Sequence, residues 1–375
     1  MNILMINGTH PETAHISSVR ASRFAVELTR MGHHCVLICP PLPGREARTP
    51  EPITEHEWSA PHVIEAADPA PTARSSIGTL ASLVRYGGRR AGFHRNVVAR
   101  GRALASDFRP QIGWSTFGTL EGVAALRTLA HEQCFPWIFD DKDNPDIYVP
   151  RIMRMPLALR LRGYAALHAN SVLHAEAAKR WLGRDAEVIY SGVDPCFFEP
   201  QLAPFPARRY VTLIGSLYHR ETVAEIVGAV ADYNDTNASP PLGIVHLGTQ
   251  GGWLANDRGV PVEAPGYVPV TEMARICQHS IANLYVFLGR TFHHKLFELF
   301  ACKRPTIAYG GELPESMAEA RRLRACLAFP TTPAALTEAL AAAESSVPDP
   351  QMPGLFFTWP EQAAMVERAM RRLVG

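Results

Sequence analysis

Several signals that would place a protein in or beyond a membrane are missing from the sequence. No stretch approaches the ~18 consecutive apolar residues that a membrane-spanning helix needs. The first residues, MNILMING, carry no basic leader before their apolar run, as an export signal would. The seven cysteines are odd in number and lack C-x-x-C spacing, which disfavours a zinc site or redox pair and favours reduced thiols. We therefore expect a cytoplasmic protein.

A surplus of charge of either sign is also missing. Lysine and arginine number 37 against 36 aspartates and glutamates, so the chain lacks the basic excess that binding to nucleic-acid phosphates requires. Apolar residues make up 47% and charged residues 19% of the sequence, which is typical of a globular protein. A chain of 375 residues exceeds what one hydrophobic core organises. We expect two domains and no nucleic-acid partner.

The first forty residues have the pattern of a βαβ unit. An apolar strand over residues 2–7 ends at Gly8, residues 17–31 have apolar positions at helical spacing, and residues 35–39 form a second apolar run. This alternation predicts a parallel sheet. Residues 40–74 are rich in Pro, Glu and Ala without periodicity, and we predict no regular structure there.

The same alternation continues along the chain. In the first half it predicts helices within 75–108, 120–133, 157–168 and 175–182, and strands over 111–115, 136–139, 171–174 and 187–189. Residues 195–206 contain four prolines and are typical of a linker. Beyond it we predict strands over 210–214, 243–247, 282–287 and 306–309, and helices over 222–233, 272–279 and 294–301. The sequence thus predicts an α/β chain with two Rossmann-like, doubly wound parallel-sheet domains and a ligand cleft.

Four motifs occur at the ends of predicted elements. They are Gly8 after the first strand, IYSGVD at 189–194 with Phe197, IGSL at 214–217, and KLFE at 295–298 at the start of a helix. Together they resemble the retaining glycosyltransferases of family 4, which have the GT-B fold. The resemblance covers most of residues 1–40 and 136–375. It implies an acceptor-side domain over 1–198, a donor-binding domain over 206–356, a central cleft, and a C-terminal helix within 357–375 that completes the first domain.

The resemblance implies transfer of a sugar from a nucleoside diphosphate sugar to an acceptor hydroxyl, with retention and without an obligatory metal or other cofactor. Glu298 matches the family residue whose carboxylate binds the ribose hydroxyls, although a solvent-facing helical glutamate would have the same sequence context. The diphosphate would lie at the amino end of the helix predicted from His294, with Lys295 and Arg220 adding positive charge. The other residues expected at the donor site are Gly8, Gly215, Ser216, Tyr267 and Leu296.

Three positions depart from the family pattern. Family members carry two glutamates separated by seven residues, and Arg290 stands where the first would be. Ser216 occupies the place of a basic residue, and Glu221 lies near that of a lysine. Two other interpretations therefore stay open: a non-hydrolysing sugar-nucleotide epimerase, and a non-catalytic protein of the same fold that binds sugar nucleotides.

The acidic run at 140–143 follows a predicted strand, which would place carboxylates at the mouth of the first domain. Family 4 relatives carry an aspartate in a similar place, facing the acceptor and the donor sugar. By this resemblance Asp141 and Asp143 are catalytic candidates, and we add His10 from the loop after Gly8. Asp141 and Asp143 also match the D-x-D that binds a divalent metal in GT-A transferases. The alternative for the acidic run is a solvated turn. The alternative for Gly8 is a glycine needed only for its own turn.

Residues 74–109 are strongly basic. They contain eight arginines and a single acidic residue, Asp107, interleaved with apolar positions such as Leu80 and Val84. A basic amphipathic face of this kind attaches to anionic lipid, which would place the protein peripherally on the inner membrane face. The alternative is a solvated helix face whose arginine stems cover apolar surface.

Overall fold

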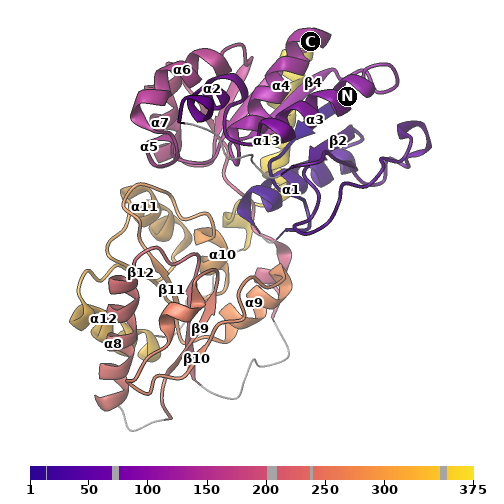
Figure 1. Ribbon diagram of the computed structural model, residues 1–375. Helices are drawn as coiled ribbons and strands as arrows, with labels where there is room; N and C mark the ends of the chain where they lie inside the picture. The colour runs from indigo at the N-terminus through magenta and orange to yellow at the C-terminus, as the bar shows by residue number, and fades with distance from the viewer. Residues whose placement is uncertain (14, 70–75, 201–208, 237–239, 347–352) are drawn as a thin grey trace. The chain divides into compact units, whose positions relative to one another are not determined.

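The computed structural model describes residues 1–13, 15–69, 76–200, 209–236, 240–346 and 353–375 (Figure 1). They form two compact units, one made of Met1–Ser191 and Trp359–Gly375 and the other of Gly192–Thr358. Each unit is built around its own parallel sheet. Among the helices of the described residues, none is long and apolar enough to cross a membrane.

The sheet of the first unit has seven strands in the order β3-β2-β1-β4-β5-β6-β7. These are β1 (Asn2–Ile6), β2 (His34–Cys39), β3 (His62–Glu65), β4 (Ile112–Thr116), β5 (Trp137–Asp141), β6 (Ala166–Ala169) and β7 (Glu187–Val188). Every pairing is parallel, with Ile3 opposite both Cys35 and Ile112. Because helices cover both faces, the central strands are near-continuous apolar runs such as NILMI rather than alternating ones.

Alternate residues of β1 contact different helices. Ile3 and Met5 pack with α1 (Ile16–Arg30) and with α13 (Trp359–Val374), the yellow helix of Figure 1. Leu4 and Ile6 point to the other face, where the core includes residues of α3 (Ala91–Ala103), α4 (Leu120–Gln133) and α6 (Arg151–Leu161). The unit also contains α2 (Ser76–Tyr86), α5 (Pro145–Tyr148), α7 (Val172–Leu182) and a 3-10 turn, Ile53–Glu55. The last helix of the chain therefore completes the first unit's core.

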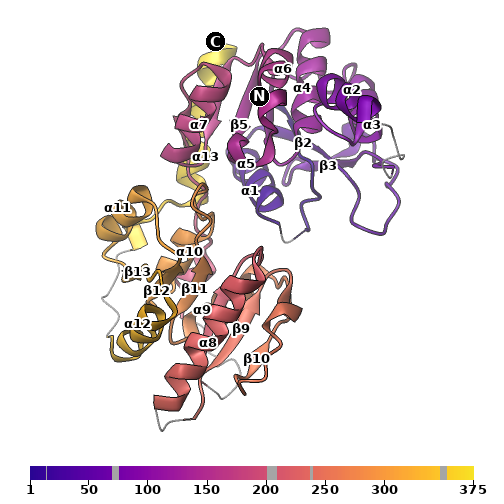
Figure 2. The same cartoon turned by 60° about the vertical axis from the view of Figure 1, so that its left-hand side comes forward.

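The sheet of the second unit has six parallel strands in the order β10-β9-β8-β11-β12-β13. These are β8 (Tyr210–Ile214), β9 (Gly243–Leu247), β10 (Val262–Glu263), β11 (Asn283–Val286), β12 (Thr306–Tyr309) and β13 (Leu327–Ala328). The helices are α8 (Arg220–Thr236), α9 (Val270–His279), α10 (Leu296–Ala301), α11 (Pro314–Leu323) and α12 (Pro333–Ser345), with 3-10 turns Pro195–Phe197, Gly251–Leu254 and Pro353–Leu355. Figure 2 shows α8 lying across one face of the sheet, where it packs with α12.

The α/β class, the doubly wound parallel sheets and most of the predicted elements are confirmed. Five predictions of local structure are wrong. The helix predicted over 157–168 is α6, which runs from Arg151 to Leu161, and the last predicted positions belong to β6. Strand β3 lies inside 40–74, where no regular structure is predicted; it has four residues, too few for a period to show. Strand β6 lies at 166–169 rather than 171–174, because Ser171 caps α7 by accepting a hydrogen bond from the His174 N–H. Strand β5 runs two residues further than predicted, and α10 begins at Leu296 rather than His294.

Candidate functional site

The strand order reverses direction at one point in each sheet, between β1 and β4 in the first unit and between β8 and β11 in the second. At such a point the loops after the two strands leave toward opposite faces of the sheet. This opens a crevice at the carboxyl ends of the strands, where open α/β sheets bind their ligands. The two crevices are therefore the candidate ligand-binding sites.

Gly215 follows β8 at the crevice of the second sheet. Its φ of +104° lies in the left-handed region, which favours glycine. Its carbonyl accepts a hydrogen bond from His246 Nε2 (2.9 Å), and its N–H donates to the Leu247 carbonyl (3.0 Å). The Gly248 backbone comes so close that an added Cβ would lie 2.0 Å from the Gly215 carbonyl oxygen. The loops after β8 and β9 thus approach each other closely, because Gly215 adopts a positive φ and Gly248 has no side chain.

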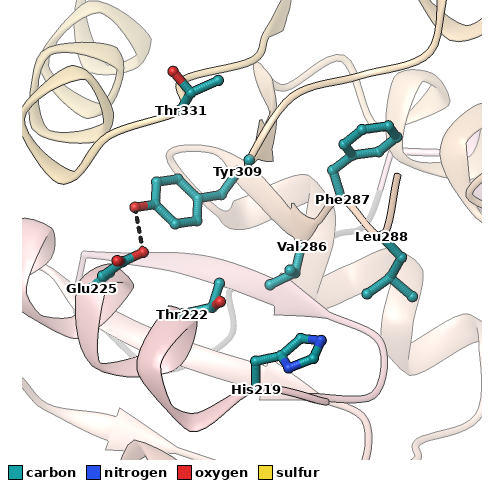
Figure 3. Close-up of a pocket in the computed structure, with 9 residues that line it drawn as sticks. His219, Thr222, Glu225, Val286, Phe287, Leu288, Tyr309 and Thr331 are labelled. Carbon is teal, nitrogen blue, oxygen red and sulfur yellow. Dashed lines mark hydrogen bonds between the residues drawn. The ribbon is translucent and has the colours of Figure 1, made fainter. Parts of the chain in front are cut away.

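A pocket of about 230 Å³ opens at the carboxyl edge of this sheet. Its lining comes from the start of α8 and from the residues at or after the ends of β11, β12 and β13 (Figure 3): His219, Thr222, Glu225, Val286, Phe287, Leu288, Tyr309, Gly310 and Thr331. In the close-up, the phenol of Tyr309 points across the pocket to the α8 side, where its hydroxyl donates to Glu225 Oε2 (2.8 Å). Burial, together with this hydrogen bond, raises the pKa of Tyr309 to about 12, so the phenol stays protonated at neutral pH.

Helix α8 starts beside this pocket with a cation. It is seventeen residues long, and its first residue is Arg220. The Arg220 side chain is exposed and its guanidinium lies 5.3 Å from the centre of the Trp253 ring. A cation at a helix amino end opposes the helix dipole, whereas an anion there is stabilised by it. Arg220 and the first N–H groups of α8 together form a positive end.

Lys295 and Glu298 form an ion pair at the start of α10. Lys295 Nζ lies 3.1 Å from Glu298 Oε2, and Lys295 occupies the N-cap position. The Glu298 side chain is only 6% exposed, so it is not the solvent-facing glutamate of the alternative interpretation. The helix has six residues and starts after His294, so its dipole is short and the phosphate role expected for its amino end is weakened. Leu296 is completely buried and contributes packing rather than an accessible side chain.

His293, which sequence reasoning passed over in favour of His294, is a half-buried part of the same edge. Its ring stacks on Tyr285 with centroids 4.1 Å apart, and its Nε2 lies 3.8 Å from the position of an added Gly215 Cβ. Burial, and then the charges of His294 and Lys295, lower the pKa of His293 to about 3. The neutral imidazole of His293, in the loop after β11, therefore lies close to Gly215 in the loop after β8. Ser216 is half-buried in this region, and Tyr267, elsewhere in the unit, is 52% exposed.

In the first unit, Gly8 is needed for packing. A Cβ added there would lie 2.2 Å from Thr119 Oγ1, at the start of α4. The Gly8 carbonyl accepts a hydrogen bond from Arg90 Nη1 (3.0 Å), and Arg90 is paired with Asp68 (2.6 Å). Gly8 therefore does allow a close approach, and the group that approaches it is Thr119 of this chain.

His10 lies in the loop after Gly8 and is 4% exposed. Its Nδ1 accepts the Glu12 N–H (3.2 Å), which leaves the proton of the neutral ring on Nε2. That Nε2 lies 3.4 Å from Glu65 Oε1 at the end of β3. The strand that sequence reasoning missed therefore supplies the carboxylate that orients His10.

Asp140 does not stand at the mouth of the domain as predicted. Because β5 continues to Asp141, Asp140 is part of the strand and is fully buried against Arg20 of α1. Arg20 Nε and Nη2 donate to the two carboxylate oxygens at 2.9 and 2.6 Å. Burial by itself raises the pKa of Asp140, but the charge and hydrogen bonds of Arg20 outweigh it, and the pKa lies below its usual range. Asp140 is a structural residue.

Asp141 points to the opposite side of β5 and is also fully buried. Neither of its carboxylate oxygens has a hydrogen-bond partner in the described part of the chain. Burial, and then the charges of Asp143 and Asp140, hold the pKa of Asp141 well above its usual range. Asp143 is 17% exposed and paired with the buried Lys142 (2.6 Å), so an ammonium group of the protein lies beside the second carboxylate of the D-x-D match.

Over the residues with described positions, no group of three or more His, Cys, Asp or Glu side chains is arranged to hold a metal ion.

The basic segment 76–109 divides into two helices with different surroundings. On α3, Phe93, Val97 and Val98 are buried in the core. On α2, Leu80 and Val84 are 49% and 38% exposed. An exposed apolar face therefore exists on α2 only.

The sequence matches no protein-family model and no curated protein. The structure is similar to many solved ones. Sucrose-phosphate synthase from Thermosynechococcus elongatus aligns with a TM-score of 0.70 over 100% of this chain and 99% of its own, at 14% identity. HepE from Anabaena, in complex with UDP and glucose, aligns at 0.62 over 100% and 96%, at 13% identity. UDP-GlcNAc 2-epimerase from Methanocaldococcus jannaschii aligns at 0.58 over 99% and 100%, at 11% identity.

These likenesses span both units and nearly the whole of each solved chain. Both sheets are entirely parallel and have the strand order of doubly wound nucleotide-binding domains. At this level of identity the similarity shows the fold alone, and the similar structures include both transferases and an epimerase. The chain has the GT-B fold, with two Rossmann-like α/β domains.

Proposed function

We propose that this chain transfers a sugar from a nucleoside diphosphate sugar to an acceptor hydroxyl, and that the nucleotide binds at the carboxyl edge of the second sheet. The observation that carries the proposal is the pocket at the crevice beside β8 and β11, bordered by the amino end of α8. Doubly wound sheets bind nucleotides at this place, with phosphate at a helix amino end. The solved structures of HepE with UDP, and with UDP-glucose, support a uridine nucleotide as the first ligand to test.

The diphosphate is proposed to lie at α8 rather than at α10. Helix α8 is seventeen residues long against six for α10, so its amino end has the fuller dipole, and Arg220 stands at its first position. Ser216 would present its backbone N–H from the loop that Gly215 shapes, with His294 and Lys295 as further donors. Such groups stabilise the negative charge that develops on the diphosphate as the glycosidic bond breaks.

Glu298 is proposed to bind the two ribose hydroxyls. Its near-complete burial and its ion pair with Lys295 hold the carboxylate in one position, which a bidentate contact with a diol requires. Tyr267, exposed after Gly266, is proposed to contact the base or the sugar. Leu296 would act by packing under the site.

On the acceptor side we propose roles for His10, Asp143 and Asp141, with Gly8 shaping the loop. His10 Nε2 is oriented by Glu65, and His10 would accept a proton at Nδ1 on releasing the Glu12 N–H, with the Glu65 carboxylate stabilising the imidazolium. Asp143 is the carboxylate of the acidic run that solvent reaches. Asp141, with its raised pKa, would act in its protonated form. His10→Ala is expected to lower kcat and leave nucleotide affinity unchanged; equal loss of both would contradict a role in the chemical step.

Retention of configuration and independence of a divalent metal are part of the proposal. The anomeric proton signals of the first product, followed by NMR before mutarotation, distinguish retention from inversion. Turnover that survives EDTA is expected, whereas loss in EDTA and recovery with Mg²⁺ would overturn metal independence.

Donor binding is the first experiment. UDP, GDP, ADP, TDP and CDP and their sugars are screened by thermal shift, and a ligand at a hundred times its Kd is expected to stabilise the protein by about 2.7 kcal/mol. Glu298→Gln should weaken the binding of the successful nucleotide roughly ten- to a hundredfold, as for hydrogen bonds to a charged group. Glu338→Gln, an exposed glutamate of α12, is the matched control. Failure of all five nucleotides would refute the proposed site.

Arg290, which stands where the family has a glutamate, makes a second experiment necessary. The donor is incubated with and without a panel of acceptors. A glycosylated product supports transfer. Conversion of the donor to its epimer without an acceptor would establish the epimerase, and tight binding without either reaction would establish a non-catalytic protein.

A further inference from the structure

Helix α6 exposes an apolar stripe. Ile152 and Met155 are 83% and 67% exposed, the two highest values among the large apolar side chains of the described residues, and Leu159 is 48% exposed. These positions follow the i, i+3, i+7 spacing that puts side chains on one face of a helix. The opposite positions, such as Met153 and Leu157, are buried in the core of the first unit. Helix α6 is therefore apolar on its outer face as well as its inner one.

Helix α2 extends this stripe. It packs against α6, and Arg160 of α6 donates a hydrogen bond to the Arg85 carbonyl at the end of α2 (3.4 Å). Figure 1 shows the two helices next to each other in the first unit. Leu80 and Val84 of α2 are spaced by one turn and exposed. We call the five side chains Leu80, Val84, Ile152, Met155 and Leu159 the α2–α6 face.

The charged side chains of α2 and α6 themselves are all arginines. Neither α2 nor α6 contains an acidic residue, and in the parts of the chain that are described Arg85, Arg151 and Arg160 form no ion pair. Burial, and then the nearby charges of Arg127 and Arg85, lower the pKa of Arg160. By contrast, Arg154 points away to Asp146 (2.5 Å). The two helices thus carry three arginines that form no ion pair among the described residues, next to exposed aliphatic groups.

We propose that the α2–α6 face docks on the surface of an anionic lipid bilayer. Its aliphatic side chains would enter the boundary between headgroups and acyl chains, and Arg85, Arg151 and Arg160 would bind lipid phosphates. An amphiphilic surface with charge of one sign is what interfacial helices present to anionic lipid. A protein partner is less well matched, because the stripe lacks the aromatic anchors that dominate protein interfaces. The site differs from segment 74–109, because the apolar side chains of α3 are buried in the core and those of α6 take their place.

Vesicle sedimentation tests the proposal. The full chain is mixed with phosphatidylcholine vesicles and with vesicles that also contain phosphatidylglycerol. Binding is expected to be at least roughly tenfold stronger to the anionic vesicles and to weaken as salt is raised. Equal binding to both, or no binding to either, would overturn the proposal.

Two substitutions locate the contact. Ile152→Glu is expected to weaken binding to phosphatidylglycerol vesicles by roughly tenfold or more without changing the melting temperature, because the side chain is outside the core. Val374→Glu, at an exposed apolar position on α13 (38%), is the matched control and should bind like the parent. Arg151→Glu separates charge from apolar contact: it should weaken binding most at low salt. Unchanged binding of both Ile152→Glu and Arg151→Glu would remove the contact from this face.

Self-association is the competing explanation for the stripe. Sedimentation velocity of the parent and of Ile152→Glu is measured in the absence of lipid. A parent that stays monomeric supports the lipid surface. A dimer that Ile152→Glu dissociates would show that a second copy of the chain covers the stripe, and would overturn the proposal.

Discussion

The carboxyl edges of the two sheets have the same strand order around their crevices, yet their polar groups are arranged differently. In the first unit, Arg20 and Asp140 are both fully buried and neutralise each other. His10 Nε2 faces Glu65, and both side chains are buried. In the second unit, a pocket stays open and Arg220 is exposed beside it. The first edge buries its charged side chains, whereas the second keeps a pocket open with an exposed arginine beside it.

The glycines that follow the first strand of each sheet show the same contrast. Gly8 has no room for a side chain because Thr119 fills the space. Gly215 has room, with its nearest neighbour 3.8 Å from an added Cβ, but its φ is +104°. One is glycine because of packing and the other because of backbone conformation. Equivalent positions in two similar sheets therefore respond to different physical requirements, and the following variants test this difference.

The largest effect is expected from Arg20→Ala. Removing the guanidinium leaves Asp140 charged, buried and unpaired, which costs about 3–5 kcal/mol of unfolding free energy. Urea unfolding of the parent and the variant measures it. Arg30→Ala is the matched control on the same helix, because its pair with Glu27 is 65% exposed on the arginine side and is worth at most about 1 kcal/mol. A loss of less than about 1 kcal/mol for Arg20→Ala would mean that the Arg20–Asp140 pair does not stabilise the first unit.

The glycine contrast comes next. Gly8→Ala and Gly215→Ala are each expected to cost about 1–3 kcal/mol, the first through overpacking and the second through strain. The double variant Gly8→Ala, Thr119→Gly should recover most of the first loss, since it removes the atoms that clash. No removal of a neighbouring side chain should rescue Gly215→Ala. Denaturant midpoints of the three variants report these differences, and an unrescued Gly8→Ala would contradict the packing explanation.

A smaller effect is expected from Arg220→Ala at the open edge. Losing one charge-assisted contact should weaken nucleoside diphosphate binding about tenfold while leaving the binding of the free nucleoside unchanged. Titration calorimetry with both ligands separates the two. Arg258→Ala removes an exposed arginine of the same unit that is paired with Asp232 (2.8 Å), and should change neither. Equal weakening for diphosphate and nucleoside would place Arg220 away from the phosphates.

The smallest effect concerns pH and the closed edge. His168 is fully buried near the Arg20–Asp140 pair, and burial lowers its pKa to about 4 from the ordinary 6.5. Below pH 6.5 the unfolded chain binds a proton that the folded chain does not, so stability falls as the pH falls toward 4. His168→Leu should remove about 1 kcal/mol of the loss between pH 6 and pH 5. Unfolding free energies at the two pH values measure it, and an unchanged difference would contradict a neutral His168.

Local sequence was sufficient where an element is an apolar run between turn residues. Strands over 210–214, 243–247 and 306–309 and the helix over 120–133 were predicted to the residue, because neighbours within a few positions determine where they start and stop. The resemblance of Lys295–Glu298 to a donor-binding motif pointed to a glutamate that the structure shows held by its own lysine. Short edge strands such as β3 lacked a period long enough to detect.

Contacts between distant residues could not be predicted in the same way. Asp140 belonged to an acidic run in the sequence, and only its contact with Arg20, 120 positions away, makes it structural. The Tyr309–Glu225 bond joins residues 84 positions apart across the pocket. His293 is positioned by Tyr285, on which it stacks, and lies near Gly215. No local pattern records such pairs.

The sequence alone determined that the chain is α/β, that its strands alternate with helices in two cycles, and that a charged motif opens a late helix. These properties depend on residue spacing and on side-chain type, which the sequence states directly. Tertiary structure decided which carboxylates are sealed, which edge keeps a pocket, and which apolar residues remain on the surface. These outcomes depend on packing and desolvation between segments far apart in the chain, and each becomes visible only after the sheets have formed.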